Sequence, residues 1–150
     1  MGKGFEDLKV YQEARKFRKR VYALTRLLPK EEQYVLVSQM RRAAVSVTNC
    51  IAEGHGSQSW KHNISYLHHS RGSVLELQDD FNTCEDEGYF KKEHLDDIRA
   101  DAVRVVQLLN GYIRYLETRV SQARKRPGKA VAVELEADES TDQRVNESTK

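Results

Sequence analysis

The sequence predicts an all-α protein, an antiparallel up-down four-helix bundle. Apolar residues recur at alternating steps of four and three through most of residues 7–119, which is the spacing of one buried stripe along an α-helix. Proline and glycine near positions 29, 54–56 and 88 divide this region into four segments of similar length. Because the connections between these segments are short, consecutive helices should run antiparallel.

The first helix is predicted over residues 7–28, with Asp7 as its N-cap. Its apolar stripe consists of Val10, Ala14, Phe17, Val21, Leu24 and Leu28. Pro29 should end this helix, because proline cannot continue it, and should open the next helix near its first turn. Glu31 and Glu32 follow, where negative charge suits the positive end of a helix dipole.

The second helix, predicted over residues 31–53, contains the most informative stretch of the chain, QMRRAAVSVTNCIAEGHG at residues 39–56. Its core positions are small, which lets neighbouring helices approach closely. Arg41 and Arg42 stand side by side near its centre. Gly54 and Gly56 are expected to end it, because glycine readily takes the positive φ of a helix C-terminus.

The third helix is predicted over residues 59–87 and the fourth over residues 91–119, and no strand pattern competes with either. Gly88 should separate them as a C-terminal stop. The apolar stripe of the fourth helix consists of Leu95, Ile98, Ala102, Val105, Leu109, Tyr112 and Leu116. Residues 1–120 are therefore predicted to form the bundle.

Arg71 is unusual because it interrupts the apolar stripe of the third helix. A cation in that position needs a partner, and a carboxylate is the usual one for a buried arginine. The candidate carboxylates are Glu53 of the second helix and Glu76 and Glu85 of the third. Alternatively, Arg71 with Arg41 and Arg42 contacts a partner at an oligomer interface or pore.

Residues 121–150 are predicted to form a mobile tail that is first basic and then acidic. A Pro-Gly pair opens residues 127–150, which lack aromatic side chains and cannot bury enough apolar area to offset the entropy of ordering. That segment has three basic and six acidic residues, a net charge of −3, so residues 1–126 carry +5. The folded part is moderately basic, a balance that favours polyanions but occurs in many other helical proteins.

The sequence also argues against several classes of protein. No run of eighteen apolar residues exists and the N-terminus lacks the apolar centre of a signal peptide, so we expect a cytoplasmic protein without a membrane partner. Glu-x-x-His is absent, and His68 and His69 are adjacent, so no metal or other cofactor is expected. Cys50 and Cys84 lack the spacing of a metal or disulfide motif. We predict no enzymatic activity.

Basic residues gather at two places in the sequence, and they are the candidate nucleic-acid-binding residues. The first helix has a dense run, Arg15 to Arg20, and its solvent-facing stripe is predicted to consist of Lys9, Lys16, Lys19, Arg20 and Arg26. The end of the fourth helix adds Arg119, Arg124, Lys125 and Arg126. We expect the two clusters at opposite ends of neighbouring helices. A phosphate-binding surface and an ordinary solvated face both fit this pattern.

Several motifs carry a resemblance to a known family. They are FEDLKVYQEA at residues 5–14, QMRRAAVSV at 39–47, IAEG at 51–54, RGSVLEL at 71–77, EGYF at 87–90 and LLNGYIRYL at 108–116. On these motifs the chain resembles the four-helix-bundle family of 23S rRNA-intervening sequence proteins. Glu53 and Gly54 fall within the motif at residues 51–54, and we expect them to have a structural role or to lie at a subunit interface. Thr48 stands where the family often has proline, and Cys50 where asparagine is usual.

The resemblance supplies the functional hypothesis. The accessory variability determinants of diversity-generating retroelements are similar in architecture, form a homopentameric ring and partner a reverse transcriptase and its RNA. By this resemblance the chain should assemble with itself, bind structured RNA or DNA, and serve a reverse transcriptase. The alternative is an adaptor ring that binds only proteins.

Overall fold

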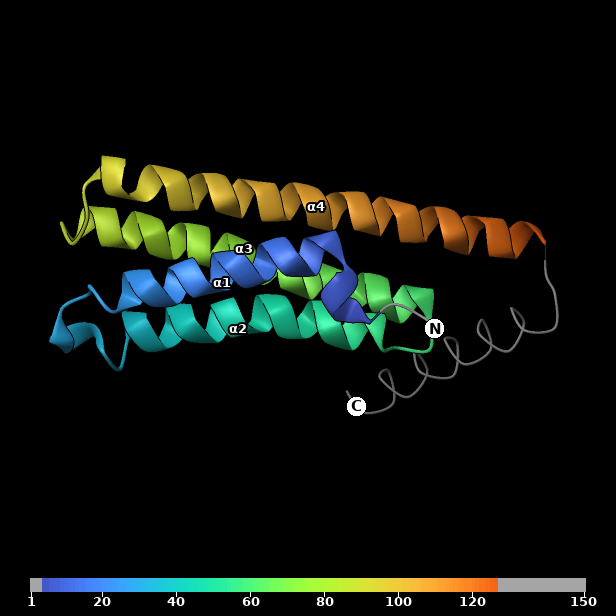
Figure 1. Ribbon diagram of the computed structural model, residues 1–150, viewed down its shortest axis with the longest axis horizontal. Helices are drawn as coiled ribbons and strands as arrows, with labels where there is room; N and C mark the ends of the chain where they lie inside the picture. Colours follow the sequence, from blue (N-terminus) through green and yellow to red (C-terminus); the bar gives the residue numbers. More distant parts are fainter. Residues whose placement is uncertain (1–3, 127–150) are drawn as a thin grey trace, which may run out of the picture.

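The computed structural model describes residues 4–126, which contain α-helices and short 3-10 helices but no strand. The elements in chain order are η1 (Phe5–Asp7), α1 (Lys9–Thr25), η2 (Lys30–Glu32), α2 (Leu36–His55), α3 (Trp60–Asp86) and α4 (Lys92–Lys125). The four α-helices lie side by side and alternate in direction (Figure 1). The predicted all-α, up-down four-helix bundle is confirmed, whereas its assembly into a ring stays a prediction.

The core lies between all four helices, because each of them turns an apolar stripe inward. α1 packs against α2 and α4, and α3 packs against the same two helices. At the centre the rings of Phe17 and Phe81 meet edge to face, with centroids 6.3 Å apart. Ala44 and Val47 of α2 and Leu109 of α4 are completely buried. The burial of these stripes is the main stabilising term of the fold.

The connection between α1 and α2 is longer than predicted. α1 ends at Thr25 instead of residue 28, and α2 begins at Leu36 instead of residue 31. The cause is Pro29, which lacks an N–H group and favours extended backbone in the residue before it, so turns and η2 fill the gap. Leu28 is only 9% exposed and fixes this connection to the core.

The start of α1 also differs from the prediction. Asp7 is not its N-cap but belongs to η1, where its backbone N–H donates to the Gly4 carbonyl at 3.1 Å. Leu8 takes the N-cap position and provides no side-chain hydrogen bond. The sequence offered a better capping residue, but the turn of η1 shifts the helix start by two residues.

α3 is close to its predicted bounds, and α4 is longer than predicted. The Ser59 hydroxyl accepts a hydrogen bond from the His62 N–H at 3.3 Å and so caps α3. Gly88 has φ +75° and ends the α3 turn as expected. α4 continues to Lys125 instead of residue 119, because nothing after the last apolar repeat breaks a helix before Pro127. The rest of the predicted tail, residues 127–150, lies outside the described residues.

Gly54 does not end α2 as predicted. It lies inside α2, and Gly56 at the C-cap has φ −80°, so the expected positive φ is not used there. A Cβ atom at position 54 would lie 2.6 Å from Asn63 Oδ1 and 3.0 Å from Tyr66 Cβ, both on α3. Gly54 therefore allows the end of α2 to approach the first turns of α3.

This contact predicts opposite effects for two glycine substitutions. Gly54→Ala should lower the free energy of unfolding by about 1–3 kcal/mol, because the added methyl group forces α2 and α3 apart. Gly72→Ala is the matched control: nothing lies within 4 Å of a Cβ there, so this exposed helical position should gain about 0.5–1 kcal/mol. Urea unfolding followed by circular dichroism measures both. Equal stabilisation by the two substitutions would contradict the close-approach role of Gly54.

Candidate nucleic-acid interface

The predicted basic stripe of α1 divides between two flanks of the helix. On the flank facing α4, Lys9 and Lys16 lie 3.0 and 3.5 Å from the Glu13 carboxylate, and Arg104 of α4 approaches it to 3.4 Å. The hydrogen bond from Lys9 lowers the pKa of Glu13 most; the charges of Lys16, Lys9 and Arg104 also lower it, against the opposing effect of desolvation. Three cations thus share one carboxylate.

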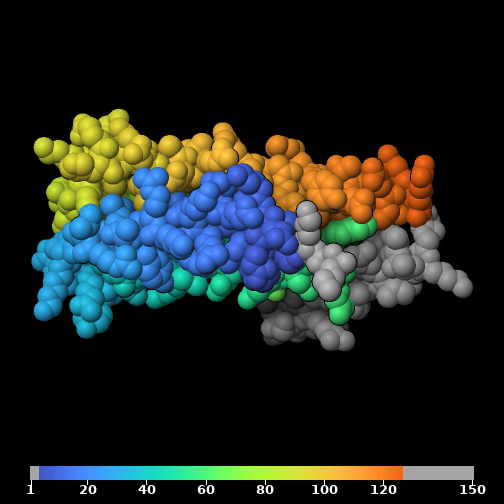
Figure 2. Space-filling view, viewed as in Figure 1, coloured from blue at the N-terminus to red at the C-terminus, as the bar shows by residue number. Residues whose placement is uncertain are grey.

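Arg20 lies on the same flank and forms an ion pair with Asp101 of α4. α1 and α4 lie against each other along the face seen in Figure 2. Part of the positive charge on this flank is therefore balanced by carboxylates. Lys9, Lys16 and Arg20 provide less free charge for a polyanion than the sequence suggested.

On the flank facing α2, the arginines have neutral partners. An Arg18 Nη atom donates to Thr48 Oγ1 at 2.8 Å, and Arg41 Nε donates to Thr25 Oγ1 at 2.9 Å. Both threonines are at most 2% exposed, so their hydroxyl groups are fixed by the core. The Arg41 guanidinium also lies over the Tyr22 ring, 5.0 Å from its centroid. These contacts orient two positive charges without neutralising them.

Further cations extend this flank. Arg18, Lys19, Tyr22 and Arg26 line an open surface pocket of about 400 Å³. Lys19 and Arg26 are exposed, and within residues 4–126 their side chains form no hydrogen bond or ion pair. Arg15, one turn before Lys19, is exposed in the same way. We define the α1–α2 cluster as Arg15, Arg18, Lys19, Arg26 and Arg41.

Acidic residues are scarce around the α1–α2 cluster. Glu13 is the single acidic residue of α1, and its carboxylate is held on the α4 flank. Glu53 is the single acidic residue of α2, and it is exposed without a hydrogen bond or ion pair in the described part of the chain. Arg42, also exposed, has none there either. Basic residues therefore far outnumber acidic ones on α1 and α2 themselves.

The prediction that Arg71 pairs with a carboxylate is wrong. This half-buried side chain donates to Asn110 Oδ1 of α4 at 2.7 Å and lies 2.8 Å from His68 Nδ1. The buried stripe of α3 passes through Ser70, which places Arg71 at the edge facing α4, where a neutral amide is within reach. Glu85 instead pairs with Arg99 of α4 at 2.5 Å.

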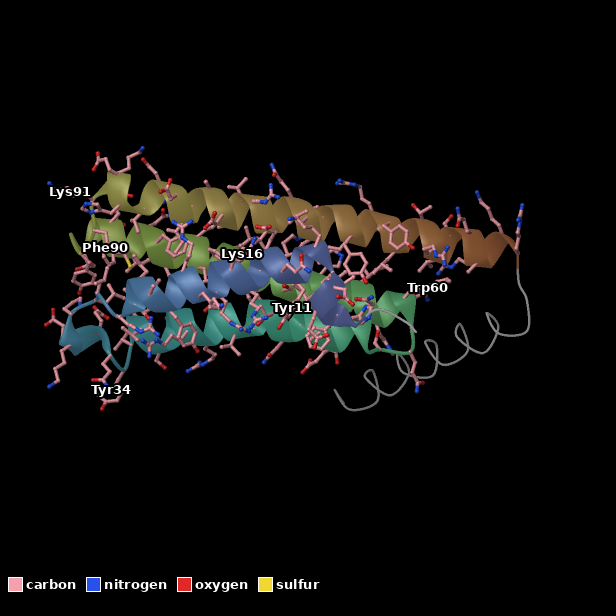
Figure 3. All side chains as sticks on the ribbon, in the orientation of Figure 1. Tyr11, Lys16, Tyr34, Trp60, Phe90 and Lys91 are labelled. Carbon is pink, nitrogen blue, oxygen red and sulfur yellow. The ribbon has the colours of Figure 1, made fainter. Side chains whose placement is uncertain are left out.

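The expected separation of the two basic clusters at opposite ends is also wrong. With four antiparallel helices, the first begins and the last ends at the same end of the bundle, as Figure 1 shows. Arg119 of α4 lies over Trp60 at the start of α3, 5.4 Å from the ring centroid, and Figure 3 labels Trp60 beside the last turns of α4. Arg124, Lys125 and Arg126 are exposed next to it.

Three further observations concern possible metal, membrane and thiol chemistry in the described residues. Within residues 4–126 no three His, Cys, Asp or Glu side chains come together as metal ligands. None of the helices in this range combines the length and the apolar character that crossing a membrane requires. Burial raises the pKa of the Cys84 thiol to about 11, aided by the charges of Asp80 and Glu32, so this cysteine is a poor nucleophile.

Asp80 of α3 is a buried ionisable residue that sequence reasoning missed. It is 3% exposed, its Oδ1 accepts a hydrogen bond from Gln39 Nε2 at 2.9 Å, and its Oδ2 has no hydrogen-bond partner among the described residues. Burial raises its pKa to about 6, and the charges of Glu76 and Asp79 add to this effect. In sequence it is an ordinary helical aspartate.

The sequence is similar to a known protein family. Residues 6–111 match the sequence profile of the 23S rRNA-intervening sequence protein family. The chain belongs to this family. The resemblance found in the sequence motifs is confirmed, while the relation to retroelement accessory proteins stays a prediction. A search of curated proteins finds no match.

A crystal structure from the S23 ribosomal protein family is similar in fold to this family member. It is a protein of unknown function from Bacteroides thetaiotaomicron VPI-5482, solved at 1.70 Å resolution. The two chains are 23% identical, with a TM-score of 0.65 over 70% of this chain and 95% of that one. At this identity the similarity bears on the fold alone.

The buried carboxylate predicts a dependence of stability on pH. Since Asp80 has a higher pKa in the folded chain than its ordinary value of 3.8, its favourable contribution is complete below that value and is lost as pH rises through about 6. Asp80→Asn should remove this loss and raise the free energy of unfolding at pH 7 by up to about 3 kcal/mol. Urea unfolding of both proteins between pH 4 and 7 measures the difference. Parallel profiles would contradict it.

Proposed function

We propose that this protein is a non-enzymatic nucleic-acid-binding protein, which holds the phosphate backbone of structured RNA or DNA on its α1–α2 cluster. One observation carries the proposal: the cations of this cluster have hydroxyl partners or none, whereas those on the opposite flank of α1 have carboxylate partners. Binding phosphates there would release counterions without first breaking an ion pair.

The geometry of the cluster favours a phosphate ligand. Arg18 and Arg41 are held by buried threonines, so little side-chain entropy is lost when they contact a ligand. Guanidinium groups match phosphate oxygens through paired N–H donors. Lys19 and Arg26 add exposed charges around the pocket that Arg18 also lines.

The length of the cluster favours a structured nucleic acid over an isolated anion. Arg15 lies within α1 and Arg26 is its C-cap residue, eleven residues later, which corresponds to about 16 Å along the helix axis. Successive phosphates of one B-form strand rise by about 3.4 Å, so the cluster can reach several of them. A single phosphate ion would use only part of this surface.

The finer parts of the proposal come from the family resemblance. We propose that the chain assembles as a homopentameric ring and acts as an accessory factor of a reverse transcriptase. Leu75 of α3 and Val103 of α4 are 52% and 47% exposed, and they supply apolar area for contacts between copies. Light scattering of the purified protein would give the mass of the assembly, and a monomer would contradict the ring.

An adaptor without nucleic acid is the second candidate, and one feature favours it. In the connection between α1 and α2, the side chains of Leu27, Tyr34 and Val35 are 73%, 86% and 63% exposed. Figure 3 shows Tyr34 projecting from this end of the bundle. Such a patch suits a protein partner. Partner binding that resists salt and is lost in Tyr34→Ser would favour the adaptor.

The α1–α2 assignment predicts the effect of removing two exposed charges. Lys19→Gln combined with Arg26→Gln should reduce the slope of log affinity against log salt by about two and weaken binding roughly 10–100-fold at 0.15 M salt. The measurement is fluorescence anisotropy of a labelled RNA hairpin and of the corresponding DNA duplex across a salt series.

A matched pair on the other flank provides the control. Lys9→Gln with Lys16→Gln makes the same change in net charge, but removes cations that share Glu13. This variant should keep nearly the whole salt slope, and circular dichroism should show both variants folded. Equal losses in the two variants would mean that net charge alone matters and that the α1–α2 cluster is not the binding surface.

A further inference from the structure

We infer that the end of the bundle where α3 begins and α4 finishes binds an unpaired nucleobase, so that the natural ligand is a duplex with a single-stranded extension. This inference deepens the proposed function and rests on it. The juxtaposition of Trp60 at the start of α3 with Tyr115 and Arg119 of α4 carries it, because the Arg119 guanidinium lies over both rings and so joins them into one aromatic-cation group.

Two members of this group, Trp60 and Arg119, line an open cavity. The Arg119 guanidinium lies 5.4 Å from the Trp60 ring centroid and 6.0 Å from that of Tyr115. Trp60 is half-buried and packs against the core, which fixes the plane of its indole. The cavity has a volume of about 540 Å³ and is lined by Trp60, Arg119, Gln122, Ala123, Lys125 and Arg126. It has room for one nucleotide.

The chemistry of the lining selects a base. Every nucleobase has a π-face that stacks on an aromatic ring or on the plane of an arginine, so this contact needs no particular sequence. An aliphatic ligand would desolvate the Arg119 guanidinium without replacing its hydrogen bonds. A simple anion would not use the indole surface of Trp60.

Phosphates adjoining that base would find positive charge nearby. Arg124, Lys125 and Arg126 are exposed at the end of α4, and within residues 4–126 none of them forms an ion pair. Arg119 has ring contacts but no carboxylate contact in the same range. Glu117, the nearest acidic residue on α4, is exposed and is not paired with any of these cations.

Within residues 4–126, the shape of the bundle leaves this end open. α1 has 17 residues and α4 has 34, and the last turns of α4 extend beyond the ends of the other helices (Figure 1). The α1–α2 cluster runs along the side of the bundle, whereas the cavity lies at its end. A duplex on the side and an unpaired strand at the end can therefore be bound together.

The test uses Trp60 as its own reporter, because it is the only tryptophan in the sequence. The full chain is titrated with three RNA hairpins: one blunt, one with a single-stranded oligoadenosine extension and one with an abasic extension of equal length. A base stacked on the indole should quench the fluorescence of Trp60. We expect quenching with the adenosine extension only, together with an affinity roughly 5–100-fold higher than for the abasic hairpin. DNA hairpins of the same design are tested in parallel.

Variants of Trp60 and Arg119 distinguish a loss of base binding from a loss of folding. In anisotropy measurements with labelled hairpins, Trp60→Ala should lose the gain from the adenosine extension and keep its affinity for the blunt hairpin. Trp60→Phe retains an aromatic face and should retain most of the gain. If Trp60→Ala fails to fold by circular dichroism, Arg119→Met provides the second test, since it should reduce the same gain several-fold.

The possible results test the base-binding cavity and the proposed function separately. Tight binding of all three hairpins without quenching would overturn the base site and leave the α1–α2 proposal intact. Quenching by the adenosine extension without binding of the blunt hairpin would support the cavity and overturn the duplex role of the α1–α2 cluster. Saturation by adenosine monophosphate at the affinity of the extended hairpin would overturn the strand assignment and identify a site for free nucleotides.

Discussion

Close packing of α2 against α3 is the constraint on which the rest of the structure depends. Gly54 has no side chain where the two helices meet, and Ser70, which is completely buried, donates a hydrogen bond to the Val47 carbonyl at 2.8 Å. These small residues bring two backbones together and fix the rotation of α3. That rotation buries Asp80 against Gln39 and moves Arg71 to the edge facing α4.

The same packing decides how the charges of α1 are used. Each residue of a helix is turned by about 100° from the one before, so a run of cations cannot all face one neighbour. α4 presents Asp101 to Arg20, whereas α2 presents the Thr48 hydroxyl to Arg18. One flank is therefore partly neutralised and the other is not. This difference, more than the total charge of the chain, makes the α1–α2 side the candidate interface.

The two candidate binding surfaces differ in the physics of recognition. Along the α1–α2 cluster, oriented charges suit a polyanion of regular shape and would bind it with a strong dependence on salt. At the end of α4, the indole of Trp60 and the plane of Arg119 suit a flat, unpaired base, whose stacking depends little on salt. The second surface exists because α4 runs antiparallel to α3 and is long enough for its last turns to lie beside the start of α3.

The sequence by itself determined the four helices, their direction and the family. The apolar repeat, Gly88 and the motifs are local patterns, and each can be recognised from residues close together in the sequence. It predicted the ends of helices less well, since Pro29 marks a break without saying how many residues the turn takes. Only the tertiary structure decided which cations are neutralised by a carboxylate and which residue binds Arg71. Both outcomes depend on which neighbouring helix covers a given flank. Helix rotation and register arise from packing across the whole core, and no stretch of sequence contains that information alone.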